Sequence, residues 1–334
     1  MKLLLIGYDL AYQPIKTFQE GFLELGYQVD FIRLDKNKLR GNTDTFTSRY
    51  VTRNELVYKD PIEIDGTGYD YVLVGNTTVC FKILNCEKVV YYHSEKTWYP
   101  SCINPTYLFS PFPENDDFFA RYYPHIIKDV EEFGLINYPV NRKKYRNLPK
   151  QSNMKESDYW DEFQLKKMRK EGLYYMGNLH TQDTKTWWMR TIYDFKFRIA
   201  AQLKEMGLLN IIHENYQKGI YQGTMQNWSL GLVVNGSGCY NSYRPYEYAV
   251  NGVIPVFVLK KNDFYPEKKY LNQFGFYNIR NCFIIDEIEL NDLNSWIEGY
   301  NTKAIRKNLL ALSKQFDVLL KIKEMENIIF NNKI

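Results

Sequence analysis

Residues 2–33 read KLLLIGYDLAYQPIKTFQEGFLELGYQVDFIR and hold a strand, a helix and a second strand in order. The apolar run at 2–6 is short and is followed by a polar loop, which is typical of a buried strand. Apolar residues then recur at helical spacing over 15–25, and Gly26 ends the helix. A second strand at 27–33 completes a right-handed β-α-β unit.

The same alternation continues along the chain and then restarts. Two more buried strands are predicted at 69–75 and 88–93, so the N-terminal half forms a parallel sheet. The segment 141–170 is polar and charged, and we interpret it as the link between two domains. Beyond it, strands are predicted at 172–177, 208–213, 230–234, 254–259 and 282–286, and helices at 183–206, 292–300 and 302–329.

Two strand-loop-helix series in one chain predict an α/β protein with two Rossmann-like, doubly wound lobes facing a cleft. A length of 334 residues fits two domains. We expect an N-terminal lobe at 1–165, a C-terminal lobe at 166–315 and a C-terminal helix at 316–334. One option is that this helix packs back on the N-terminal lobe.

Composition excludes several classes of protein. With 45% hydrophobic and 25% charged residues, the chain can build packed cores and is not largely disordered. The net charge of +4 is too small for a protein that coats nucleic acid, so any contact with nucleic acid must be local.

The five cysteines form no CxxC pair, which indicates neither a zinc site nor a disulfide framework. A reducing, cytoplasmic location fits best, in the host cell if a phage encodes the protein. No run of residues has the length of a membrane span, and we expect a monomer.

Ligands of open parallel sheets bind beyond the carboxyl ends of the strands, so the informative residues follow each strand. In the first lobe these include Asp9, His93 and Glu95, and in the second Gly177 and Asn178. None of these loops is a GxGxxG or GxxxxGK[ST] motif, which disfavours a common nicotinamide dehydrogenase or an ATPase.

The strongest local motif, residues 241–257, reads NSYRPYEYAVNGVIPVF. Arg244 and Glu247 are three residues apart at a helix start and so share a face. The first can bind phosphate through two parallel hydrogen bonds, and the second can accept hydrogen bonds from vicinal hydroxyls. The alternative is an ordinary ion pair within the helix, worth about 0.3 to 0.5 kcal/mol.

This motif resembles the R-x-x-E-x-x-x-x-G-x-x-P-V segment of nucleotide-sugar glycosyltransferases of the two-lobed GT-B fold. The resemblance implies that Arg244 contacts the donor diphosphate and that Glu247 binds the ribose hydroxyls. It also implies a nucleotide-sugar donor, with a UDP-sugar favoured. Nothing indicates an obligatory cofactor, and a divalent metal is possible but not indicated.

A looser resemblance, to the DNA β-glucosyltransferases of T-even bacteriophages, runs through 69–78, 90–95, 173–178 and 242–247. That family glucosylates hydroxymethylated cytosine in duplex DNA. Its catalytic base is an Asp that follows a strand with two adjacent tyrosines, and Glu95 is the nearest equivalent in this chain. Where that family has arginines in the first loop of the second lobe, this chain has the residues His180 and Lys185.

The resemblances imply an inverting hexosyl transfer in which an acceptor hydroxyl, most readily that of a modified base in phage DNA, attacks the sugar. Glu95 is the expected general base, with Asp9 and His93 as competitors. The expected donor residues are Gly177, Asn178, His180, Lys185, Tyr221, Tyr243, Arg244 and Glu247. The rival functions are a glycan or protein glycosyltransferase of the same fold and a non-catalytic nucleotide-sugar-binding protein.

Overall fold

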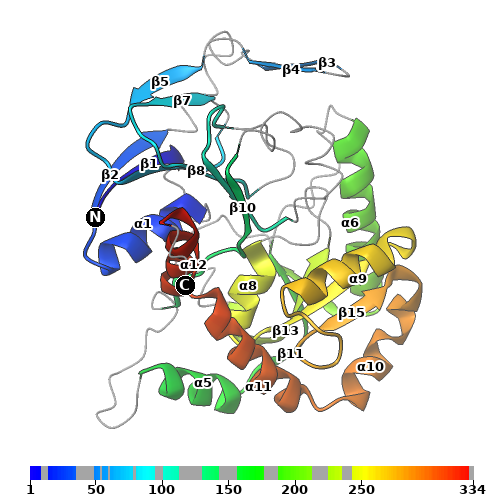
Figure 1. Ribbon diagram of the computed structural model, residues 1–334. Helices are drawn as coiled ribbons and strands as arrows, with labels where there is room; N and C mark the ends of the chain where they lie inside the picture. The colour runs from blue at the N-terminus through cyan, green and yellow to red at the C-terminus, as the bar shows by residue number, and fades with distance from the viewer. Residues whose placement is uncertain are drawn as a thin grey trace. The chain divides into compact units, whose positions relative to one another are not determined.

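The computed structural model describes residues 1–8, 14–34, 49–52, 55–58, 61–77, 80–94, 101–112, 130–142, 156–176, 187–212, 225–234 and 243–330 (Figure 1). The chain forms two compact units. The first contains Met1–Asn141 and Asp317–Ile334, and the second is Arg142–Phe316.

The first unit is built on a six-stranded sheet in the order β10-β9-β8-β6-β1-β2. All its neighbouring strands are parallel. The strands are β1 Lys2–Tyr8, β2 Gln28–Leu34, β6 Tyr71–Val74, β8 Val89–Tyr92, β9 Tyr107–Ser110 and β10 Glu132–Leu135. Together with α1 (Pro14–Glu24), β1 and β2 confirm the β-α-β unit predicted from residues 2–33.

Two small sheets accompany the large one, and neither was predicted. The strands β3 (Arg49–Thr52) and β4 (Glu55–Tyr58) pair antiparallel. The strands β5 (Ile62–Asp65) and β7 (Phe81–Leu84) pair parallel.

Helix α12 (Val318–Ile329) packs beside α1 in the same unit (Figure 1). Gly21 of α1 permits the close approach, because a Cβ there would lie 2.7 Å from Ile322 and 2.8 Å from Val318. Both helices cover a core of large side chains from the sheet, in which Phe18 meets Tyr92 edge to face at 5.1 Å. The C-terminal helix is thus an integral part of the first unit.

The second unit has a five-stranded parallel sheet in the order β12-β11-β13-β14-β15. Its strands are β11 Lys170–Met176, β12 Leu209–Ile212, β13 Trp228–Val234, β14 Ile254–Leu259 and β15 Phe283–Asp286. Its helices are α5 Glu156–Lys166, α6 Trp187–Glu205, α8 Tyr243–Val250, α9 Phe264–Gln273, α10 Leu293–Gly299 and α11 Thr302–Ser313. Short 3₁₀ turns lie at Lys261–Asp263, Glu287–Asp292 and Lys314–Phe316.

Two sequence interpretations are corrected here. The segment taken as a linker contains α5, whose residue Asp161 forms ion pairs with Arg142 and Lys314 at 3.3 and 3.1 Å. The helix predicted at 302–329 is broken at Lys314–Phe316. A new helix starts there because the Asp317 carboxylate accepts the Leu319 N–H at 3.0 Å, which is an N-cap.

Candidate functional site

The carboxyl edge of the second sheet, where its parallel strands end, has a topological switch point. Strands β12 and β13 lie on opposite sides of β11, so the connections after β11 and β13 lead away in opposite directions. A crevice for a ligand is expected between such diverging connections. The described residues that flank it include the ends of β11 and β13.

Tyr175, Arg244 and Lys196 come together at this edge from β11, α8 and α6. The guanidinium carbon of Arg244 lies 5.1 Å from the centroid of the Tyr175 ring, and the Lys196 ammonium lies 5.9 Å from it. Both distances fall within the range of cation–π attraction. Tyr175 itself is only 1% exposed. Of these three residues, only Arg244 was predicted from the sequence.

The two cations act on the Tyr175 phenol. Burial raises the pKa of this phenol, but the positive charges of Arg244 and Lys196 outweigh that effect and leave the pKa below its ordinary value. The two cations therefore give this edge a positive potential. An anionic group of a ligand would be stabilised by the same two charges.

Glu247 lies one helical turn beyond Arg244 on α8, as predicted, and both side chains are half-buried. The helix has Pro245 in its first turn, where its missing N–H leaves no helical hydrogen bond unmade. Tyr243 starts the helix and is also half-buried. A cation and a carboxylate thus flank the start of α8, as the binding of phosphate and sugar hydroxyls would require.

The position of α8 is fixed by close packing and by buried arginines. A Cβ on Gly231 of β13 would lie 2.5 Å from the Tyr248 ring, so only glycine admits this ring against the sheet. At the far end of α8, Arg169 donates to the Asn251 carbonyl at 2.9 Å, and Arg306 donates to that of Gly252 at 2.8 Å. Burial and the nearby Arg306 lower the pKa of Arg169 to about 9. This network holds the helix that carries Arg244 and Glu247.

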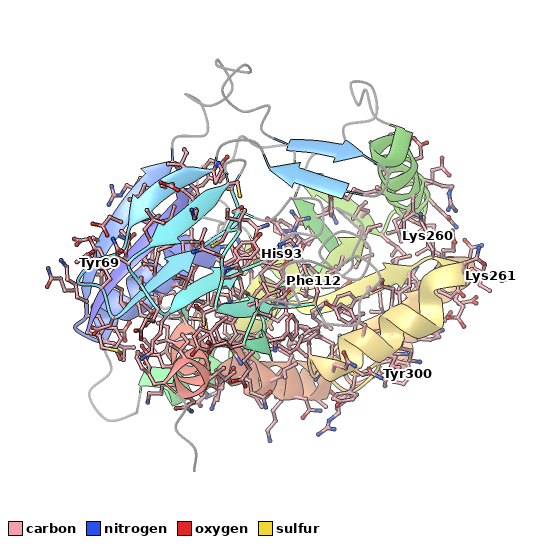
Figure 2. All side chains as sticks on the ribbon, turned by 45° about the horizontal axis from the view of Figure 1, so that its top comes forward. Tyr69, His93, Phe112, Lys260, Lys261 and Tyr300 are labelled. Carbon is pink, nitrogen blue, oxygen red and sulfur yellow. The ribbon has the colours of Figure 1, made fainter. Side chains whose placement is uncertain are left out.

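In the first unit, His93 is fully buried after β8. Its Nδ1 is 3.0 Å from the Tyr91 hydroxyl, and its ring centroid is 6.1 Å from that of Phe112, which Figure 2 shows beside it. The backbone N–H of His93 donates to the Phe109 carbonyl at 2.8 Å. These contacts fix the position of the ring, and the role of His93 as a competing base stays a prediction.

Most other predicted site residues lie outside the described part of the chain. They are Asp9, Glu95, Gly177, Asn178, His180, Lys185 and Tyr221. Their roles stay predictions. The described residues hold no group of three or more His, Cys, Asp or Glu side chains arranged to bind a metal ion. None of the described helices has both the length and the apolar character of a membrane span.

No protein-family model matches the sequence, and a comparison with curated proteins finds no match. Solved structures match over nearly the whole chain. A trehalose-6-phosphate synthase, OtsA, has a TM-score of 0.55 at 8% identity and covers 100% of this chain and 99% of its own.

Two further matches were solved with a nucleotide sugar. An alpha-glucosyltransferase in complex with UDP-glucose and DNA containing an abasic site has a TM-score of 0.53 at 13% identity and covers 98% of this chain and 99% of its own. HepE of Anabaena in complex with UDP-glucose has a TM-score of 0.50 at 11% identity, with coverage of 98% and 99%. The predicted fold class is confirmed: the chain has the GT-B fold, with two α/β units that each carry a doubly wound parallel sheet.

Proposed function

We propose that this protein is a glycosyltransferase that takes its sugar from a nucleoside diphosphate sugar, with a UDP-sugar favoured. The observation that carries the proposal is the pair of cations, Arg244 and Lys196, around buried Tyr175 at the switch point of the second sheet. Two proteins of the same fold were solved with UDP-glucose, which supports this donor.

In this proposal the second unit binds the donor. Arg244 and Lys196 neutralise the diphosphate, and Glu247 accepts hydrogen bonds from the ribose hydroxyls. The other proposed contacts come from the sequence. The amides of Gly177 and Asn178 and the side chains of His180 and Lys185 bind the phosphates. The side chains of Tyr221 and Tyr243 bind the nucleoside.

The acceptor oxygen bonds to C1 of the sugar while the bond from C1 to the β-phosphate oxygen breaks. The electron pair of that bond leaves with the nucleoside diphosphate, whose added charge the two cations stabilise. The hydroxyl proton passes to Glu95, the proposed general base, with Asp9 as the competing carboxylate. In-line attack of this kind inverts the configuration at C1, and the proton NMR coupling of the product's anomeric hydrogen measures that outcome.

The proposed acceptor is a hydroxymethylated base in phage DNA. Support comes from the phage-type sequence resemblance and from a structural match that was solved with DNA. The test is transfer of radiolabelled glucose from UDP-glucose to a duplex that contains hydroxymethylcytosine, with the unmodified duplex as the matched control. We expect label only in the modified duplex and less of it as salt is added. Label only in saccharide acceptors would show a glycan glycosyltransferase instead.

The lowered pKa of Tyr175 predicts how donor affinity depends on pH. The pKa of this phenol lies below the ordinary tyrosine value of about 10, so the phenol ionises as pH rises toward that value. The phenolate then pairs with Arg244 and Lys196 and competes with the diphosphate. Affinity for UDP should therefore fall on the alkaline side and stay level at lower pH.

Titration calorimetry with UDP between pH 7.5 and 10 measures this effect. Tyr175→Phe keeps the ring under Arg244 but cannot ionise, so its affinity should fall less over the same range. Comparing the two proteins cancels the titrations that they share, such as that of the uracil ring. Identical pH profiles would exclude Tyr175 from the diphosphate site.

A further inference from the structure

The carboxyl edge of the first sheet has a switch point of its own, between β1 and β6. Strands β2 and β6 lie on opposite sides of β1, so this edge is where the first unit should bind a ligand. Gly7 and Gly75 line it, and a Cβ on either would come within 3.0 Å of Ile15 in the first turn of α1. Asn76 follows Gly75 and is the first polar residue after β6 in the sequence.

The orientation of the Asn76 amide is fixed by Ser94. The Ser94 N–H donates to Asn76 Oδ1 at 2.7 Å, and the Ser94 hydroxyl lies 3.4 Å from the same oxygen. A backbone N–H can only donate, so the atom that faces it must be the oxygen. The amide nitrogen, Nδ2, therefore points away from Ser94.

Asn76 Nδ2 is a buried donor that no described residue accepts from. The side chain is 3% exposed, and the nitrogen is shielded from solvent. A buried donor left without a partner costs about 1 to 3 kcal/mol. Such a group indicates a ligand when it lies where the fold binds ligands.

Several polar groups next to Asn76 are paired, although Asn137 Oδ1, beside Tyr138, is also buried without a partner among the described residues. The Ser101 hydroxyl accepts from the Thr77 N–H at 2.7 Å and donates to the Thr77 carbonyl at 3.0 Å. The Tyr138 hydroxyl donates to the Ser94 carbonyl. Ser94 is thus held on both its N–H and its carbonyl.

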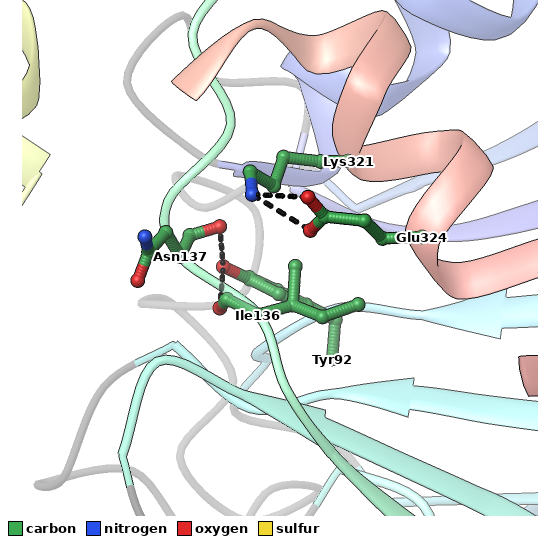
Figure 3. A network of polar contacts seen from close by, with 5 residues as sticks. All are labelled: Tyr92, Ile136, Asn137, Lys321 and Glu324. Carbon is green, nitrogen blue, oxygen red and sulfur yellow. Dashed lines mark hydrogen bonds and ion pairs between the residues drawn. The ribbon is translucent and has the colours of Figure 1, made fainter. Parts of the chain in front are cut away.

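The segment that carries Tyr138 is itself anchored to the sheet. The Tyr92 hydroxyl of β8 contacts the carbonyls of Ile136 and Asn137 at 3.4 and 3.2 Å, as Figure 3 shows. The backbone immediately before Glu95 is therefore held in place, and Asn76, whose Nδ2 has no partner among the described residues, belongs to the same hydrogen-bonded group.

We propose that Asn76 binds the acceptor, donating a hydrogen bond from Nδ2 to an uncharged carbonyl or hydroxyl oxygen of the acceptor molecule. This inference rests on the proposed transferase function and adds to it a recognition residue in the first unit. This hydrogen bond positions the acceptor next to Ser94, the residue before Glu95. The bond is lost if the amide nitrogen of Asn76 is replaced.

Asn76→Asp tests the proposal, because it keeps the oxygen that Ser94 needs and replaces the donor with a second oxygen. With hydroxymethylated duplex as the acceptor, we expect KM for the duplex to rise ten- to a hundredfold, while affinity for UDP-glucose stays the same. Lowering the pH should restore KM in this variant, because the protonated carboxyl donates again. Asn76→Ala, which introduces no charge, should show the raised KM without the recovery at low pH.

The matched control is Asn104→Asp in the same unit. The Asn104 amide is exposed, and both of its polar atoms are paired: it accepts from the Ile83 N–H at 3.0 Å and donates to the Ile83 carbonyl at 2.7 Å. This variant should lose thermal stability and keep the acceptor KM. An unchanged acceptor KM in both Asn76 variants, with normal transfer by the unaltered protein, would overturn the inference alone. Failure of the unaltered protein to bind UDP-glucose would instead overturn the proposed function.

Discussion

Replacing Arg244 with alanine should lower kcat/KM for the nucleotide sugar by about two to three orders of magnitude. Removing one group that stabilises a developing negative charge costs about 10²- to 10³-fold in rate. Arg244 is the cation fixed over the buried Tyr175 ring, so its loss leaves Lys196 as the remaining described charge beside that ring. Steady-state kinetics with saturating acceptor measures the effect.

Two variants make this result specific. Arg244→Lys keeps the positive charge but not the planar fork, so it should recover only part of the loss. Arg198→Ala removes another cation of the same unit, an exposed one that pairs with Glu287 at 2.6 Å, and should change the rate less than twofold. A near-normal rate for purified Arg244→Ala would contradict the assignment of the donor site.

Replacing Glu95 with glutamine should lower kcat by about 10²- to 10⁴-fold, the usual contribution of a general base. Glutamine has nearly the same shape but cannot take the acceptor proton at neutral pH. Affinity for UDP-glucose should stay the same, because the proposed donor residues lie in the second unit. Single-turnover kinetics and titration calorimetry measure the two quantities separately.

The matched substitution, Asp9→Asn, distinguishes the two carboxylates. If Glu95 is the base, Asp9→Asn should retain most of the turnover. The opposite pattern, with a large loss only in Asp9→Asn, would assign the base to Asp9. Equal and small losses in both variants would rule out a carboxylate base at either position.

The sequence predicted the strands and helices that are marked by a local pattern of apolar residues. The strands at both switch points, the helix at 15–25 and the short helix of the Arg244 motif were found, because each is a buried apolar run or a helical repeat ended by glycine. The break at Lys314–Phe316 was missed, because apolar spacing continues through it. The break is caused by the Asp317 N-cap and by the packing of the Phe316 ring against Tyr246, with ring centroids 4.6 Å apart.

The candidate site was predictable only where one motif contains it. Arg244 and Glu247 are close in sequence, so their shared face followed from helical spacing alone. Tyr175 and Lys196 lie on other elements, and a double tyrosine in a strand does not show that the second ring will meet two cations. Asn76 was overlooked for the same reason, since its orientation depends on Ser94, 18 residues further along the chain.

Binding of a nucleoside diphosphate sugar is tested by a calorimetric titration of the unaltered protein with UDP-glucose, followed by competition with UDP and with uridine. The proposed donor site predicts saturable binding that UDP displaces and uridine displaces far more weakly, because the nucleoside lacks the diphosphate that Arg244 and Lys196 neutralise. Absence of binding, or equal displacement by uridine and UDP, would contradict it.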